Sequence, residues 1–352
     1  MHTHTFYRTA ESVSPKHPDK LCDQISDAIL DAYLAEDPTS RVAAETCGGH
    51  GVVFVTGEIT SNAKNVNIEK IVHRLAGENT KVHQKLVKQS PEIAQGVDVG
   101  GAGDQGIMIG YACDETPELL PLEVVLSRRL NKFIYAEYPF DGKTQVTLNP
   151  DGKLSSIVAS FQNTPSEKLS QLIPEWLQKE NLLEKGRSVT IISKEHLNDK
   201  AKFAALTADK NSILAYVNPA GDWTQGGFEA DTGLTGRKLI VDNYGPRIPI
   251  GGGCFSGKDA TKVDRSAAYM ARRIAVDYLK KNHAHEVYVR LAYAIGVAEP
   301  LEKTVIIDGK SEQITGYDLT PKGIINFLNL RRPIYEATAR YGHFGEGFDW
   351  DK

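Results

Sequence analysis

A glycine-rich loop followed by a long helix is the feature that most limits how this chain can fold. Residues 251–259 read Gly-Gly-Gly-Cys-Phe-Ser-Gly-Lys-Asp, with four glycines in the first seven positions. The N–H groups of such a backbone can approach an anion closely, because few side chains shield them. Apolar residues at helical spacing predict a helix over 262–281, whose N-terminus directs a partial positive charge at the loop. Loop and helix together predict a polyphosphate site.

Charged side chains gather around this loop. Lys258, Lys262 and Arg265 add positive charge to the backbone donors. Asp259 and Asp264 are oxygen ligands of the kind that a divalent cation takes. A flexible surface loop is the plain alternative, but it does not explain why lysines and aspartates occur together here.

The same loop resembles a P-loop only in part. The spacing Gly252-x4-Gly257-Lys258 fits, but Asp259 stands where the magnesium-binding hydroxyl belongs. The preceding segment, residues 246–250, holds two prolines and is a poor candidate for a buried parallel strand. An ordinary P-loop nucleotidase or kinase is therefore disfavoured.

Bulk composition excludes several classes of protein. The chain has 352 residues, 41% of them hydrophobic and 24% charged, which is ordinary for a globular protein of two or three domains. The net charge of −4 gives no general support for nucleic-acid binding. No apolar run approaches the ~20 residues that span a bilayer, and the first fifteen residues lack the apolar core of a secretory signal. Four scattered cysteines suit a reducing compartment, so we expect a cytoplasmic protein without membrane contact.

The start of another predicted helix, near the N-terminus of the chain, also holds candidate functional residues. Pro18 suits the first turn of a helix, so His17 and Asp19 lie beside unsatisfied backbone donors. Taken alone, this stretch favours the plainer interpretation of Asp19 as a favourable first-turn acid. Three further acids recur at intervals of four and are predicted to form the solvated face: Asp23, Asp27 and Asp31.

Two acidic residues lie in strands that are otherwise small or apolar. Strands are predicted over 41–46 and 51–60, joined by a turn at 47–49, and they contain Glu45 and Glu58. A carboxylate in such a strand costs several kcal/mol unless it is solvated, paired or bound to a cation. A helix that starts near Ile68 and closes at Gly77 follows.

The segment 95–106 is rich in glycine and satisfies the dinucleotide fingerprint G-x-G-x-x-G at Gly101–Gly106. Context argues against that assignment, because residues 107–112 are predicted to form a strand, whereas the fingerprint must open a helix. We expect residues 95–103 to act as a mobile lid over a ligand, with an inert linker as the alternative.

The rest of the chain alternates strands and helices. A hairpin begins at Asp141 and turns at 150–152, so that Asp141 and Lys143 share one face. Trp223, beside a glycine-rich stretch, suits stacking on a purine, although a packed tryptophan is commoner. Helices are predicted over 121–137, 166–180 and 321–330, and strands over 188–193, 213–218, 238–243, 286–294 and 303–308. Each third of the chain thus pairs a few strands with one or two helices.

Motifs along the whole chain resemble the S-adenosylmethionine synthetase (methionine adenosyltransferase) family. They occur in the family's order, and the longer ones are highly specific: K-H-P-D-K (16–20), G-E-I-T (57–60), G-A-G-D-Q-G (101–106), D-T-G-L-T-G-R-K (231–238), G-G-G-x-F-S-G-K-D (251–259), K-V-D-R-S-A-A-Y (262–269), I-G-V-A-E-P (295–300) and Y-G-H-F-G (341–345).

The resemblance implies three similar α+β domains about a pseudo-threefold axis, which we place at 1–100, 101–229 and 230–352. It further implies a homo-oligomer, expected to be a tetramer of two tight dimers whose active sites are shared between subunits.

The reaction implied by the resemblance joins L-methionine to ATP. The methionine sulfur attacks C5′ of the ribose, triphosphate leaves, and it is then cleaved to diphosphate and phosphate. A neutral thioether needs no general base, which agrees with the lack of a Ser/His/Asp or Cys/His relay in the sequence. The implied cofactors are two Mg²⁺ ions per site and K⁺.

The resemblance also implies roles for particular residues. The implied catalytic residues are His17, Lys143, Arg237 and Lys258. The implied ATP-binding residues are His17, Asp141, Lys143, Asp222, Trp223, Asp231, Arg237, Lys238, Cys254 and Lys258, and the methionine-binding residues are Glu58, Gln95, Asp231 and Lys262. The implied metal ligands are Asp19 and Asp264 for Mg²⁺ and Glu45 for K⁺.

Three departures from the family pattern bear on these assignments. Cys254 replaces a usual alanine, Trp223 stands where phenylalanine is common, and the segments between Glu58 and Ile107 are shorter than in the common bacterial form. The remaining rivals are a regulatory nucleotide-binding protein that has lost catalysis and a P-loop kinase.

Overall fold

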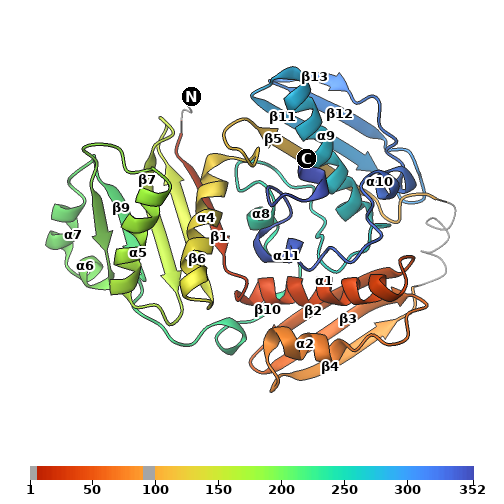
Figure 1. The fold of residues 1–352 in the computed structure, drawn as a ribbon, viewed down its shortest axis with the longest axis horizontal. Coiled ribbons are helices and arrows are strands. Elements are labelled where there is room, and N and C mark those ends of the chain that lie inside the picture. The colour runs from red at the N-terminus through yellow and green to blue at the C-terminus, as the bar shows by residue number, and fades with distance from the viewer. Residues whose placement is uncertain (1–5, 90–99) are drawn as a thin grey trace.

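Three β-sheets with their helices make up the molecule in a computed structural model that describes residues 6–89 and 100–352 (Figure 1). The strand orders are β1-β6-β7-β9-β8, β10-β2-β3-β4 and β13-β12-β11-β5. The predicted α+β class is confirmed. No helix in the described ranges is long and apolar enough to cross a membrane.

The central sheet begins with the first strand of the chain. β1 (Arg8–Val13) pairs antiparallel with β6 (Gly142–Leu148), and β7 (Leu154–Phe161), β9 (Ile213–Val217) and β8 (Val189–Ile192) follow. Helices α4 (Leu122–Glu137) and α5 (Ser166–Lys179) cover it and share its apolar core. The hairpin turn at 150–152 is confirmed.

The N-terminal sheet is covered on one face by α1 (Pro18–Glu36) and α2 (Ile68–Ala76). Its strands are β2 (Arg41–Gly49), β3 (Val52–Thr60), β4 (Lys81–Val87) and β10 (Gly233–Leu234). The predicted turn at 47–49 is wrong: β2 runs on to Gly49, and the chain reverses at His50 and Gly51. Both turn residues have positive φ, 51° and 80°, as a two-residue hairpin loop requires.

The C-terminal sheet packs against the helix that follows the glycine-rich loop. This helix, α9, spans Val263–Asn282, close to its prediction, and lies on β5 (Gly106–Cys113) and β11 (Glu286–Tyr293). The other strands are β12 (Glu302–Ile307) and β13 (Lys310–Gln313). As predicted, the residues that follow the G-x-G-x-x-G sequence form a strand, β5, and not a helix.

Each sheet takes a strand from another part of the chain. β1 belongs to the central sheet, β5 to the C-terminal sheet, and β10 to the N-terminal sheet. The domain boundaries at residues 100 and 229 stay a prediction, because the sheets do not follow contiguous segments of sequence.

The strand predicted over 238–243 is wrong. These residues form the short helix α8 (Leu239–Asp242), where Asp242 N–H donates to Lys238 C=O and Asn243 N–H to Leu239 C=O. The helical turn carries Asp242 inward, to a position that is 2% exposed. The remaining helices are α6 (Lys194–Asn198), α7 (Lys200–Leu206), α10 (Pro321–Phe327), α11 (Thr338–Tyr341) and the 3₁₀ turns Gly227–Glu229 and Asp349–Asp351.

The acids of α1 do not form a solvated face, so that prediction is wrong as well. Asp23 and Asp27 are 1% and 0% exposed. Asp23 Oδ1 accepts the Gly236 N–H at 2.8 Å, and Asp27 Oδ1 accepts the Gly257 N–H at 2.8 Å. Asp31 accepts the N–H groups of residues 335 and 336. Helix α1 therefore fastens three loops of the C-terminal third to the N-terminal sheet.

Asp27 also forms a fully buried ion pair. The Arg265 guanidinium donates to both oxygens of Asp27, at 2.6 and 2.9 Å, and neither side chain is exposed. Removing one partner leaves the other charge unpaired in a low-dielectric interior.

We therefore expect Asp27→Ala to lower the free energy of unfolding by about 3–5 kcal/mol in urea titrations followed by circular dichroism. The matched control is Asp151→Ala at an exposed position, where we expect a change within about 0.5 kcal/mol. Equal stabilities of the two variants would contradict the importance of the pair.

Candidate active site

His17 is the N-cap residue of α1, and its position fixes its hydrogen bonding. Its Nδ1 accepts the Asp19 N–H at 3.2 Å, which leaves Nε2 to carry the proton of the neutral ring. The ring is 6% exposed. Burial, with the charges of Lys238 and Lys143, lowers the pKa of His17 to about 3. At neutral pH, His17 is thus an uncharged N–H donor.

Asp19 links the first turn of α1 to the loop that follows β10. One oxygen accepts the Leu234 N–H at 3.0 Å, and the other lies 2.5 Å from Lys238 Nζ. Arg237 Nε lies 3.4 Å from the same carboxylate. Burial alone raises the pKa of Asp19, but Lys238 and the backbone donor outweigh it and hold the pKa below its usual value.

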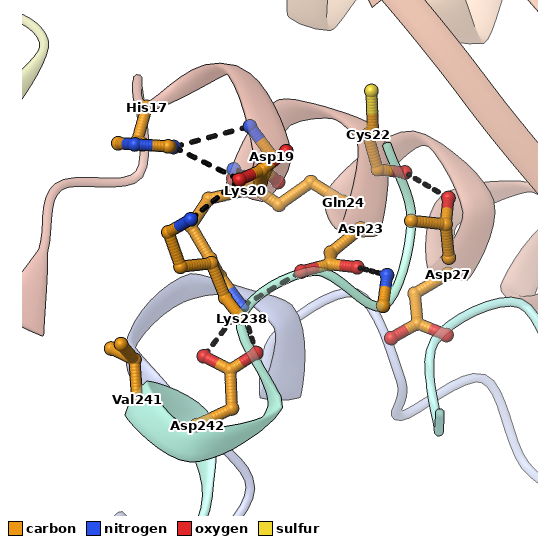
Figure 2. A network of polar contacts seen from close by, with 12 residues as sticks. His17, Asp19, Lys20, Cys22, Asp23, Gln24, Asp27, Lys238, Val241 and Asp242 are labelled. Carbon is orange, nitrogen blue, oxygen red and sulfur yellow. Dashed lines mark hydrogen bonds and ion pairs between the residues drawn. The ribbon is translucent and has the colours of Figure 1, made fainter. Parts of the chain in front are cut away.

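Behind Asp19 lies a fully buried network of charges (Figure 2). Lys20 Nζ donates to Asp242 at 2.7 Å and to Asp23 at 3.2 Å. Burial raises the pKa of Asp23 to about 6, although Lys20 opposes the shift. The network joins α1 to α8, and so holds the segment that carries Arg237 and Lys238. The four-residue spacing of the acids in α1 is the sequence pattern that could have indicated this network, but it was interpreted as a solvent-exposed face.

Several predicted ATP-site residues lie around His17. Lys143 and Asp231 are close enough for their charges to shift the pKa of His17, and both side chains are exposed. Asp141 accepts the Gly227 N–H at 2.9 Å. Trp223 Nε1 donates to Ser160 Oγ at 3.1 Å, and Ser160 pairs with Lys143 across β6 and β7.

The glycine-rich loop forms a second cluster. Lys258 Nζ lies 2.6 Å from Asp264 Oδ2, at the first turn of α9. Asp264 packs directly on Gly253, where a Cβ atom would come within 2.2 Å of the carboxylate carbon. Glycine is thus required at this position for the acid to reach the loop.

The two clusters meet within one chain. A Cβ atom on Gly236 would lie 2.5 Å from Cys254 Cβ, so the Arg237 segment touches the glycine-rich loop. Cations and carboxylates from 17–19, 237–238 and 254–264 therefore surround one region.

Two predicted residues have partners elsewhere, and a third is not described by the structure. Asp222 accepts from Ser166 and Asn218, and so ties down the start of α5. Lys262 Nζ lies 2.5 Å from Asp259 Oδ2. Gln95, with most of the predicted lid at 95–103, lies outside the described residues.

Glu45 and Glu58 lie on the face of the N-terminal sheet opposite to α1. Glu45 pairs with Thr56 across β2 and β3, and Glu58 pairs with Ala43, which places both acids on the outer face. Glu45 is exposed and Glu58 half-buried. Near the end of β4, Gln89 has a buried amide oxygen without a hydrogen-bond partner in the described chain, a candidate that the sequence did not suggest.

The candidate site could bind each magnesium ion through one protein carboxylate. No group of three or more His, Cys, Asp or Glu side chains in residues 6–89 and 100–352 could hold a metal ion. Magnesium is commonly held by one or two carboxylates, several waters and substrate phosphates. Asp19 and Asp264 meet that requirement once each releases its lysine.

We expect His17 to make the protein less stable in acid. Its folded pKa of about 3 lies below its usual 6.5, so the unfolded chain binds more protons at intermediate pH. The contribution of neutral His17 to the free energy of unfolding is complete above pH 6.5. It is lost as the pH falls toward 3, by at most about 1.4 kcal/mol per pH unit. Unfolding of wild type and His17→Gln from pH 7 to 4 should show a difference that shrinks with acid. Parallel curves would contradict the burial of a neutral ring.

Comparison with known families covers nearly the whole chain. The family model described as "S-adenosylmethionine synthetase, N-terminal domain" matches residues 5–91. The corresponding central domain matches 99–223, and the C-terminal domain matches 225–352.

Proposed function

Because the chain belongs to the S-adenosylmethionine synthetase family and makes S-adenosylmethionine from methionine and ATP, we propose that the clusters at His17 and Lys258 bind the triphosphate that this reaction expels. The observation that carries the proposal is the placement of Lys238 and Lys258, each held by one carboxylate, on adjoining segments.

In the proposed reaction, the methionine sulfur donates a lone pair to C5′ of the ribose as the bond from C5′ to the triphosphate oxygen breaks. Negative charge gathers on the leaving oxygen, and preorganised donors lower the barrier there. His17, Lys143, Arg237 and Lys258 take this role. Neutral His17 donates from Nε2, and the three cations supply charge. Water then cleaves triphosphate to diphosphate and phosphate.

The remaining ATP contacts are proposed from the same arrangement. Trp223 stacks on the adenine, a role supported by its hydrogen bond to Ser160, the residue that pairs with Lys143 across the sheet. Asp141, Asp222, Asp231, Lys238 and Cys254 complete the ATP site. Methionine is held by Glu58, Gln95, Asp231 and Lys262, where a carboxylate pairs with its ammonium group and Lys262 with its carboxylate.

Metal ions would enter through Asp19, Asp264 and Glu45. Two Mg²⁺ ions at Asp19 and Asp264, when bound, neutralise the charge that develops on the triphosphate. With a metal ion at each carboxylate, Lys238 and Lys258, now paired with Asp19 and Asp264, would be free to contact phosphate oxygens. Glu45, whose side chain is exposed, would hold K⁺.

The cation assignments are tested with Asp264→Asn and Glu45→Gln. We expect Asp264→Asn to lower S-adenosylmethionine formation at least about 100-fold at limiting Mg²⁺, because it loses several kcal/mol of charge stabilisation. We expect K⁺ to stimulate the wild type and Glu45→Gln to lose this stimulation. The assay follows the sulfonium product together with phosphate and diphosphate. Near-normal turnover of Asp264→Asn at low Mg²⁺ argues against its role, and ADP as product indicates a kinase.

We further propose that two copies pair through the outer face of the N-terminal sheet and then form a tetramer. On this face, Phe54 of β3 is 53% exposed and Leu234 of β10 is 38% exposed. Glu45 and Glu58 lie on the same face of the sheet as Phe54, so a partner there would complete a shared site. The four cysteines are free, which supports a cytoplasmic location that cell fractionation can test.

Phe54→Lys should therefore yield a smaller particle in sedimentation and little activity, since a buried cation opposes association. The control Phe327→Lys alters a phenylalanine that is also 53% exposed, on α10, and should sediment as wild type. Activity retained by a monomeric Phe54→Lys would show that one chain suffices.

A further inference from the structure

A small cavity lies beside the magnesium ligand proposed at the start of α9. Its volume is about 10 Å³, close to the space that one water molecule occupies. Asp264 and the glycine-rich loop form one part of the wall, and residues 107–109 of β5 form another. Asn243, the residue that follows α8, completes it. Segments that are far apart in the sequence therefore meet around a space for a single water.

Asn243 brings to this cavity a polar group that the protein does not satisfy. Its side-chain oxygen Oδ1 is buried and has no hydrogen-bond partner within residues 6–89 and 100–352. The whole residue is 4% exposed. A buried acceptor that is left unsatisfied costs about 1–3 kcal/mol. Asn243 Oδ1 thus requires a donor that the described chain does not supply.

The backbone holds Asn243 in this place. Its N–H donates to Leu239 C=O at 3.0 Å, and its C=O accepts from the buried guanidinium of Arg128 at 2.8 Å. The preceding residue, Asp242, accepts from Lys20 at 2.7 Å. The amide of Asn243 therefore stays at the cavity unless several buried contacts break.

The carboxylate of Asp264 is the second acceptor in the wall. Lys258 donates to its Oδ2 at 2.6 Å. Gly106 and Gly253 pack against the same carboxylate, because a Cβ atom on either would lie within 3.0 Å of one of its atoms. Close packing limits where the carboxylate can lie, and one further hydrogen bond would fix how it is turned.

One water can satisfy both acceptors, since it has two hydrogens to donate. β5 is the last strand in its sheet, so backbone groups on its outer side are not used by the sheet and can complete the usual three hydrogen bonds of a buried water. We propose that Asn243 is a positioning residue: it holds one water against Asp264, and this water sets the orientation in which the carboxylate meets Mg²⁺. The inference rests on the magnesium role proposed for Asp264.

Binding of Mn²⁺ tests this role without turnover, because Mn²⁺ takes the same oxygen ligands as Mg²⁺ and electron paramagnetic resonance separates the free from the bound ion. The titration uses the full chain with a non-hydrolysable ATP analogue. Asn243→Leu is similar in shape but accepts no hydrogen bond, and we expect it to bind one equivalent of Mn²⁺ at least about ten-fold more weakly. Asn243→Ser restores a hydroxyl and leaves room for another water, so it should recover most of the affinity.

The matched control is Asn131→Leu. Asn131 lies on α4, is 0% exposed and also has a side-chain oxygen without a partner in the described ranges, but it does not line this cavity. We expect Asn131→Leu to bind Mn²⁺ as the wild type does, even where urea titration shows a loss of stability. Wild-type affinity in Asn243→Leu, or an equal loss in Asn131→Leu, would overturn the inference.

Combination with Asp264→Asn separates positioning from a general loss of structure. If Asn243 acts through Asp264, Asn243→Leu/Asp264→Asn should bind Mn²⁺ no more weakly than Asp264→Asn alone, whereas additive losses contradict this route. Should Asp264→Asn bind Mn²⁺ like the wild type, the proposed magnesium role itself fails, and the role of Asn243 fails with it.

A crystal structure of the wild type provides a test that needs no variant. We expect a water within about 3 Å of both Asn243 Oδ1 and the Asp264 carboxylate. An amide that is turned to a protein partner, with no water in the cavity, would refute the inference and leave the proposed function untouched.

Discussion

Four aspartates at four-residue intervals on α1 hold the structure together. Asp19, Asp23 and Asp27 each accept a backbone N–H from Leu234, Gly236 and Gly257, respectively, and Asp31 accepts two from residues 335 and 336. One helix face thereby sets the positions of both loops that carry the candidate catalytic cations. The geometry of the site therefore depends on α1, although α1 itself supplies only His17 among the four residues proposed to be catalytic.

Burying this many carboxylates is unfavourable unless each is compensated. Arg265 neutralises Asp27 through two hydrogen bonds, and Lys20 is shared between Asp23 and Asp242. Burial raises the pKa of Asp23 to about 6 with help from the nearby charge of Asp242, and Lys20, which is shared between the two acids, opposes the shift only in part. Neighbouring Asp19 faces the opposite situation, because it meets both Arg237 and Lys238 at the edge of the site.

Local chemistry could be read from the sequence, and long-range pairing could not. The glycine-rich loop, α9 and the capped start of α1 were predicted because their signals lie within a few residues. Asp23 and Asp27 were misassigned, since a spacing of four describes a helix face without saying what covers it. The strand predicted over 238–243 became α8 because Asp242 pairs with Lys20, a partner more than two hundred residues away.

The exchange of strands among the three sheets has a consequence for how the chain is made. Synthesis proceeds from the N-terminus, and domains usually fold as they emerge. Here β1 must wait for β6, β5 at residues 106–113 must wait for β11 at 286–293, and the N-terminal sheet gains its edge strand only with Gly233. A ribosome-bound chain therefore carries incomplete sheets with open edges until the last third appears. Open strand edges can pair with other chains, so β5 is open to such pairing until residues 286–293 have been translated.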